Sequence, residues 1–263
     1  MENLYIIKIG GNIIDNPSKL TQFLQKFSAL EGKKILIHGG GKIASQLADK
    51  LGLEVKMHKG RRITDQEMLD VVLMVYGGLI NKNIVSQLQS LQCNSIGLTG
   101  ADMNVIRAIK RPVKEIDYGF VGDVTEVNQK ALSDLLENGY MPVIAPLTHD
   151  GSGLMLNTNA DTIASEVAVA MAAVYKTHLL YCFEKKGVLT DVNDENSVIP
   201  LLNEQNYAHY LAENVIFAGM IPKLDNAFAA LRKGVTQVVI FEADSLSEIE
   251  KTAFIGTKII LGK

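Results

Sequence analysis

Cysteine is scarce in this chain of 263 residues, which contains only Cys93 and Cys182. Two cysteines so far apart in sequence are too few for a disulfide framework or a zinc site. The start of the chain lacks the basic and then apolar pattern of a secretory signal. No apolar run reaches the roughly 18 residues that span a bilayer. We therefore expect a cytoplasmic protein that has no membrane partner.

The charge balance shows no excess of basic residues. Lysine and arginine together number 26, aspartate and glutamate number 29, and the formal net charge is −3. Proteins that bind nucleic acid or anionic membranes through electrostatics carry a basic surface. The composition thus argues against a nucleic-acid partner. With 47% hydrophobic residues, the chain reads as an ordinary soluble enzyme that acts on a small molecule.

Short apolar runs alternate with helical patterns, which predicts an α/β protein with a central, mainly parallel sheet. The expected strands cover residues 4–9, 34–38, 95–98, 141–145, 177–182, 237–241 and 258–261. The expected helices cover residues 42–51, 65–91, 129–138, 159–173, 203–212 and 221–233. Residues 103–127 and 146–156 alternate around glycine-rich turns, which predicts β-hairpins at the rim of the sheet. A second run of strand–helix units starts near residue 175, so we expect an N-terminal lobe of residues 1–175 and a C-terminal lobe of residues 176–263.

A lysine interrupts the first apolar run. By the period-two alternation of a strand, Lys8 lies on the same face as Leu4 and Ile6. A buried ammonium group without a partner is costly, so we expect an anion near the end of this strand. The strand ends at Gly10 and Gly11, whose bare backbone suits a phosphate. The alternative is a lysine that extends to solvent at the strand end.

A second glycine cluster, Gly39, Gly40 and Gly41, follows an apolar strand and precedes a predicted helix. This arrangement directs backbone N–H groups and a helix dipole at an anion. The cluster lacks the spacing of a Walker loop and of a dinucleotide-binding fingerprint. A tight glycine-rich turn without a ligand is the alternative.

Two helix starts are further candidates. Lys223 follows Pro222 in the first turn of a predicted helix, where the dipole disfavours a cation and a bound anion would reverse that effect. The alternative is an ordinary exposed lysine. Asn159 is the expected N-cap of another helix, with Asp161 in its first turn. An aspartate in that position is also a common partner of the dipole.

Taken in order along the chain, these segments resemble one family, the amino-acid kinases. The motifs that carry the resemblance are IKIGG at 7–11, HGGG at 38–41, GRRIT at 60–64, NK at 81–82, GFVGDV at 119–124, LENGYMPV at 136–143, NTNAD at 157–161 and GMIPK at 219–223. Each motif alone is weak, but their order and spacing are specific. The resemblance implies a three-layer α/β/α sandwich in which the two lobes share one continuous sheet.

Within this family, the chain resembles the members that phosphorylate the side-chain carboxylate of N-acetyl-L-glutamate in arginine biosynthesis, with ATP and Mg²⁺ as cofactors and no metal ligands expected from the protein. The resemblance implies that Lys8 and Lys223 stabilise the transferring phosphoryl group and that Asp161 orients them. The residues implied to bind the N-acyl-L-glutamate substrate are Gly40, Gly41, Arg62 and Asn157. The residues implied to bind ATP are Gly10, Gly11, Glu184, Gly187, Val188, Ile216 and Phe217.

The implied reaction needs no general base, because a glutamate carboxylate with a pKa of about 4.3 is already ionised at neutral pH. The histidines show no metal or triad spacing, and we expect none of them in catalysis: His38, His58, His149, His178 and His209. The obstacle is repulsion between an anion and a polyanion, which positively charged groups and positioning reduce. Arg62 suits the substrate α-carboxylate because a guanidinium binds a carboxylate bidentately, and Arg61 is an alternative for that role.

Two segments depart from the family pattern. At 181–188 the chain carries Glu184 where an aspartate is usual, which leaves the nucleotide contacts open. Near the acyl pocket, Ala101 and Met103 stand where a lysine and a glycine are more usual. A longer acyl group such as succinyl is therefore an alternative to acetyl, with its extra carboxylate near a basic cluster. That cluster consists of Arg107, Lys110 and Arg111.

Other functions also compete with this interpretation. A kinase acting on aspartate, glutamate, carbamate or uridylate would share Lys8 and the glycine turns, but not the Arg62 and Asn157 segments together. A non-catalytic nucleotide-binding regulator is a further alternative, as is a nicotinamide-dependent oxidoreductase, against which the missing fingerprint argues.

The helix expected at 65–91 is longer and more apolar than one core face needs, which predicts a homodimer along it. The first strand begins by residue 4, which leaves no room for the extra N-terminal helix of the arginine-inhibited hexamers in the family. We therefore expect a homodimer that arginine inhibits only weakly.

Overall fold

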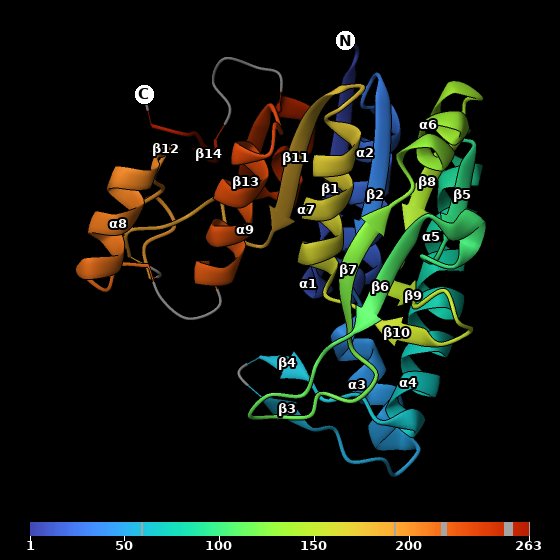
Figure 1. The fold of residues 1–263 in the computed structure, drawn as a ribbon. Coiled ribbons are helices and arrows are strands. Elements are labelled where there is room, and N and C mark those ends of the chain that lie inside the picture. The colour runs from blue at the N-terminus through green and yellow to red at the C-terminus, as the bar shows by residue number, and fades with distance from the viewer. Residues whose placement is uncertain (59, 192, 217–219, 250–254, 263) are drawn as a thin grey trace. The chain divides into compact units, whose positions relative to one another are not determined.

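The computed structural model describes residues 1–58, 60–191, 193–216, 220–249 and 255–262. The chain forms two compact units (Figure 1). The first unit combines Met1–Lys34 with Ala164–Lys263, and the second consists of Ile35–Ile163. The predicted division at residue 175 is a different one, because it separates a substrate lobe from an ATP lobe that share one sheet. This functional division remains a prediction.

The first unit is built on a mainly parallel sheet. Its strand order is β12 (Leu201–Leu202), β14 (Thr257–Ile259), β13 (Gln237–Glu242), β11 (Lys176–Phe183) and β1 (Asn3–Ile9). β11 runs parallel to both β1 and β13, whereas β14 runs antiparallel to β13. Almost every side chain of β1 is buried, as expected for a strand in a parallel sheet that is covered on both faces.

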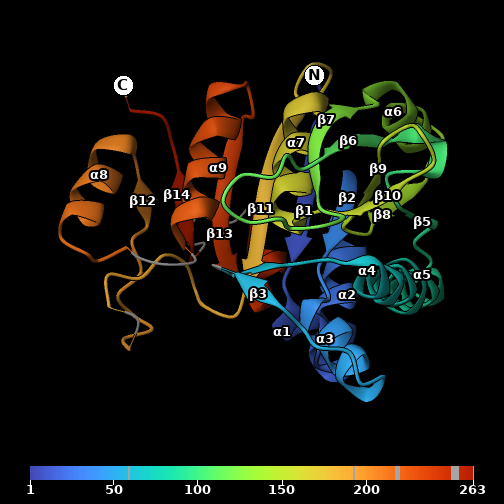
Figure 2. The ribbon, with the colours of Figure 1, turned by 60° about the horizontal axis from the view of Figure 1, so that its bottom comes forward.

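Helices cover both faces of this sheet. Figure 2 shows α9 (Ile221–Arg232) and α7 (Ala160–Met171) on one side of the strands and α2 (Pro17–Ala29) on the other. Further helical elements among the described residues of the unit are α1 (Gly11–Ile14), α8 (Glu204–Ala212) and the 3₁₀ segment Ala243–Glu248. Helix α2 was not among the expected helices, although Asn16 caps it and Pro17 opens it.

The second unit contains a parallel sheet with the order β2 (Lys33–His38), β8 (Met141–Ile144) and β5 (Ser95–Leu98). A second sheet has the order β10 (Met155–Asn157), β9 (Leu147–His149), β6 (Ile106–Lys110) and β7 (Gly122–Val127). The antiparallel pairs β6–β7 and β9–β10 confirm the two predicted hairpins. A two-stranded ribbon joins β3 (Met57–His58) to β4 (Arg61–Arg62).

The helices of the second unit include α3 (Gly41–Lys50), α6 (Gln129–Glu137) and the long helix predicted at 65–91. That long helix is made of α4 (Gln66–Val72), a π-helical segment (Leu73–Ile80) and α5 (Asn81–Ser90). Asp65 is its N-cap, and its carboxylate accepts a hydrogen bond of 2.9 Å from Met68 N. The sequence did not indicate the π-helical segment.

The long helix is the one candidate membrane span among the described residues, by length and composition. Its most apolar stretch is 50% buried inside the protein, and core helices of soluble proteins meet the same criterion. Every strand and helix predicted from the sequence is present with small shifts at its ends, and the α/β class with a mainly parallel sheet is confirmed.

Candidate functional site

Lys8 occupies the buried position in β1 that the strand alternation predicts, with 7% of its surface exposed. It lies opposite Tyr181 of β11 in the parallel register. Its Nζ is 5.6 Å from the ring centroid of Phe183. A Cβ built on Gly10 would lie 4.0 Å from the same Nζ, so the ammonium group turns toward the glycines at the strand end.

Lys223 approaches the same aromatic ring. It lies in the first turn of α9, with Pro222 at the helix start as predicted. Its Nζ is 5.1 Å from the ring centroid of Phe183. Both lysines, which were selected separately from the sequence, thus lie near the same ring. Sequence reasoning assigned no role to Phe183.

The turn after β1 also contacts the divergent segment at 181–188. Helix α1 begins at Gly11, and Asp15 N donates a hydrogen bond of 2.7 Å to its carbonyl oxygen. The side-chain amide of Asn12, in the same helix, donates to the carboxylate of Glu184. Glu184 therefore lies beside the glycine turn of β1, where the phosphates were expected.

Three of the residues expected at ATP line a separate apolar cavity of about 130 Å³. Its lining consists of Lys185, Gly187, Val188, Leu189, Val215, Ile216 and Met220. Val188 N donates a hydrogen bond of 2.8 Å to Thr257 Oγ1, and a Cβ on Gly187 would approach the same oxygen to 2.7 Å. Close packing therefore requires glycine at this position. Phe217, also expected at ATP, lies outside the described residues.

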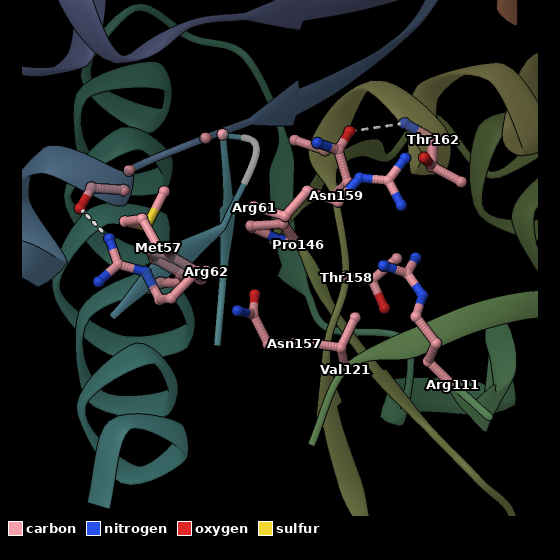
Figure 3. Close-up of a pocket in the computed structure, with 16 residues that line it drawn as sticks. Met57, Arg61, Arg62, Arg111, Val121, Pro146, Asn157, Thr158, Asn159 and Thr162 are labelled. Atoms are coloured by element: carbon pink, nitrogen blue, oxygen red, sulfur yellow. Dashed lines mark hydrogen bonds between the residues drawn. The ribbon is translucent and has the colours of Figure 1, made fainter. Parts of the chain in front are cut away.

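A pocket of about 220 Å³ in the second unit contains all four residues expected to bind the acyl-amino acid (Figure 3). Its lining consists of Gly39, Gly40, Gly41, Met57, Gly60, Arg61, Arg62, Tyr76, Arg111, Val121, Pro146, Asn157, Thr158, Asn159, Ala160 and Thr162. In Figure 3, Arg62 and Arg111 come from opposite sides of the pocket, with Asn157 between them. Three arginines in one small pocket favour a ligand with carboxylate groups.

Position 40, in the glycine turn of this pocket, requires glycine for two structural reasons. Its φ of 150° lies in a region that residues with a side chain rarely adopt. A Cβ there would also collide with Ile80 and approach a ring carbon of Tyr76 to 3.1 Å. The π-helical segment, which supplies both side chains, thus lies directly against the turn that opens α3.

Arg62 is held in a defined orientation at the wall of the pocket. Its Nη2 donates hydrogen bonds of 2.8 Å to both Gly41 O and Ser45 Oγ. Burial raises the pKa of the Tyr76 hydroxyl, and the neighbouring Arg62 acts in the opposite direction. Ser45 and Tyr76 were missed by sequence reasoning, because their contacts depend on how the β3–β4 ribbon meets α3.

The start of α7 forms another wall of the pocket. Asn159 is the N-cap, as predicted, and its Oδ1 accepts from the backbone N–H groups of Asp161 at 2.8 Å and Thr162 at 3.1 Å. Asn157 Nδ2 donates to Thr64 Oγ1 at 2.9 Å, which orients the amide. Asp161 is 8% exposed and belongs to the second unit, so its expected action on the two lysines remains a prediction.

Arg111 is the one member of the predicted basic cluster among the residues that line this pocket. It forms an ion pair of 2.6 Å with Asp123. Arg107 instead lies 3.7 Å from Glu126, and the Lys110 ammonium lies 4.6 Å from the ring centroid of Phe120. A larger hollow of about 770 Å³ also has Arg61, Arg111 and Thr162 in its lining.

His38 directly precedes the glycine turn, and its ring contacts the backbone of Gly39. It is fully buried, and burial lowers its pKa from 6.5 to about 4. Its Nδ1 lies 2.8 Å from Gly39 O, and its Nε2 lies 3.2 Å from Asn81 Nδ2. The ring is therefore neutral at pH 7, with the proton on Nδ1, and Asn81 also donates to Val143 O at 2.9 Å.

The sequence matches the amino acid kinase family over residues 3–242. It is 57% identical over 262 residues to an acetylglutamate kinase from Cytophaga hutchinsonii, covering 99% of each chain. It is 59% identical over 247 residues to an acetylglutamate kinase from Phocaeicola vulgatus, covering 94% of this chain and 96% of the relative. The structure is similar to the crystal structure of smu.665 from Streptococcus mutans UA159, with a TM-score of 0.76, 30% identity and coverage of 97% and 98% of the two chains. This chain belongs to the amino acid kinase family.

Proposed function

We propose that this protein transfers the γ-phosphoryl group of ATP to the side-chain carboxylate of N-acetyl-L-glutamate, a step of arginine biosynthesis. The observation that carries this proposal is the 57% and 59% identity to acetylglutamate kinases across nearly the whole chain. The protein is thus a phosphotransferase with a carboxylate acceptor. Such a reaction uses metabolites of the cytoplasm, where the composition also leads us to expect the protein.

The pocket of the second unit supports the acceptor site. Arg62, fixed by Gly41 and Ser45, is suited to the α-carboxylate of the substrate. Gly40 and Gly41 open helix α3, where backbone N–H groups and the helix dipole favour an anion. Asn157 supplies an amide of defined orientation for the polar atoms of the acyl-amino acid.

In the proposed step, an oxygen of the ionised carboxylate forms a bond to the γ-phosphorus as the bond from that phosphorus to the β–γ bridging oxygen breaks. ADP carries the released electron pair away, so no proton has to be removed from the nucleophile. The ammonium groups of Lys8 and Lys223 would neutralise the charge on the transferring group, which is the main requirement of phosphoryl transfer. We assign Asp161 the role of orienting them.

The first unit supports an ATP site. The apolar cavity beside Gly187, Val188 and Ile216 suits a flat aromatic base, and the turn at Gly10 and Gly11 suits phosphates. Among the described residues, no three histidine, cysteine, aspartate or glutamate side chains group as a metal site. Mg²⁺ commonly retains phosphate and water ligands and, when bound with ATP, would neutralise phosphate charge.

N-succinyl-L-glutamate is a second candidate acceptor, favoured by one observation. Arg111 lines the pocket in addition to Arg61 and Arg62. A third guanidinium suits the extra carboxylate of a succinyl group. Arg111 is already paired with Asp123, so this carboxylate would share an existing ion pair.

We also infer a homodimer formed along the long helix. Met74 and Leu79, both in its π-helical segment, are 54% and 53% exposed. Exposed apolar side chains on a helix that is otherwise half-buried are typical of a surface covered by a second subunit.

An ADP-release assay with four acceptors tests the function: N-acetyl-L-glutamate, N-succinyl-L-glutamate, L-glutamate and L-aspartate. We expect the highest kcat/KM with N-acetyl-L-glutamate. A preference for the succinyl compound would select the second candidate, and activity only with a free amino acid would contradict both.

A further inference from the structure

The ring of Phe183 lies close to both of the proposed catalytic lysines. Phe183 is the last residue of β11, two positions beyond Tyr181, which is the partner of Lys8 in the parallel register. By strand alternation, Phe183 therefore points to the same side of the sheet as Lys8. Both ammonium groups lie within the roughly 6 Å of a ring centroid at which a cation–π attraction operates.

The ring itself is held by its neighbours. It stacks on Tyr181, with 6.3 Å between centroids and 18° between planes. Tyr181 is completely buried between β1 and β13. The Phe183 ring is therefore held in a fixed position at the end of the strand, and its face carries partial negative charge.

Two ammonium groups that converge on one site repel each other. A ring face attracts each of them without removing its charge. The aromatic ring can thus offset part of this repulsion and hold both side chains near the end of β11.

We propose that Phe183 is a positioning residue that gathers the Lys8 and Lys223 ammonium groups for phosphoryl transfer. This inference rests on the proposed function and adds to it a residue that acts through the two lysines. Its effect should fall on kcat, because the ring contacts the charges that act in the transition state. Loss of two cation–π contacts predicts a fall of about fivefold to thirtyfold in kcat.

The test replaces Phe183 in the full-length protein by monofluoro-, difluoro- and trifluorophenylalanine. Fluorine withdraws the negative charge of the ring face stepwise and hardly changes its shape, so log kcat should fall steadily along the series while KM for MgATP changes little. Phe183→Tyr should retain kcat, and Phe183→Leu should lose the full factor. The matched control is the same fluorine series at Phe23, which stacks on Phe27 inside the first unit and should leave kcat unchanged.

A second measurement reads the geometry without turnover. Lysine side-chain NMR should show Cε protons of Lys8 and Lys223 shifted by the ring current, and Phe183→Leu should abolish the shift. A wild-type protein that phosphorylates an acceptor but shows a flat fluorine series overturns this inference alone. A wild-type protein that releases no ADP with any acceptor overturns the proposed function. If the wild-type protein also shows no ring-current shift for Lys8 and Lys223, the placement of the two lysines at the ring is rejected as well.

Discussion

Arg62 and Gly41 are joined by a hydrogen bond of 2.8 Å from the guanidinium to the backbone carbonyl. This bond connects the side chain proposed to bind the substrate α-carboxylate to the glycine turn that opens α3. Since Ser45 accepts a second hydrogen bond from the same nitrogen, the guanidinium and the helix start form one rigid unit. A change at Arg62 should therefore disturb both parts of the acceptor site.

Arg62→Lys should raise KM for the acyl-amino acid at least tenfold and leave KM for MgATP within about twofold, because a point charge cannot reproduce a bidentate fork. Steady-state kinetics with each substrate varied in turn measures both constants. Ser45→Ala is the matched control and should have a smaller effect in the same direction. Equal changes in the two KM values would remove Arg62 from the acceptor site.

Lys8→Met and Lys223→Met should each lower kcat by roughly 10²–10³, the scale for removing one preorganised charge-stabilising donor. Substrate affinity should change less. Lys130→Met, which removes an exposed lysine paired with Asp134 on α6, is the control and should retain activity. Turnover near the wild-type value in either test variant, at saturating MgATP, would reject the role of that lysine.

Gly40→Ala should destabilise the protein by about 2–5 kcal/mol, because an unfavourable backbone conformation and a collision with Ile80 act together. Gly52→Ala is the matched control: its φ is 75°, but no atom lies within 4 Å of the added Cβ. Strain alone should then cost about 1–2 kcal/mol. Urea unfolding of both variants measures the difference, and equal losses would show that packing against the π-helical segment is unimportant.

His38 should make the stability depend on pH. Its pKa is about 4 in the folded protein and 6.5 in the unfolded chain, so the unfolded state binds the extra proton first as the pH falls. The contribution is complete above pH 6.5 and is lost between pH 6.5 and 4, by about 3 kcal/mol at most. Urea unfolding from pH 7.5 to 4.5 should show this loss in the wild-type protein, and His38→Gln should flatten the profile relative to it. Parallel profiles would contradict a neutral, buried His38.

Met74→Glu combined with Leu79→Glu should convert the proposed dimer into a monomer, because two carboxylates would have to be desolvated in the interface. Sedimentation velocity measures the change. Leu51→Glu, at a similarly exposed apolar position after α3, should leave the dimer intact. A monomeric wild-type protein, or a dimer that survives the double substitution, would place the interface elsewhere or remove it.

Much of the fold could be predicted because the relevant signals are local. The alternation of β1 placed Lys8 on the buried face, and the cap at Asn159 located the start of α7. Helix α2 also carried local signals, a capping Asn16 before Pro17, which were not used. The π-helical segment has no comparable signal, since its extra residue per turn is accommodated by contacts with other elements.

Parts of the candidate site depend on register and packing, which a single sequence does not encode in any short motif. Phe183 reaches Lys8 only because β1 and β11 pair with Lys8 opposite Tyr181. Ser45 reaches Arg62 only because the β3–β4 ribbon folds onto α3. Lysine and glycine motifs could therefore be found from their own chemistry, whereas their supporting residues could not.

The interleaving of the two units sets the order in which they can be completed during synthesis on the ribosome. All of Ile35–Ile163 emerges from the ribosome before β11 and β13. The second unit can therefore fold while β1 still lacks β11, its neighbour in the sheet of the first unit. For that interval the strand that carries Lys8 is an apolar segment whose edge toward β11 is unpaired, the kind of segment that chaperones bind and that aggregates readily. Stalling the nascent chain at a length that exposes Ile163 but keeps β11 inside the ribosome should therefore yield a protected acceptor pocket attached to a protease-sensitive N-terminal strand.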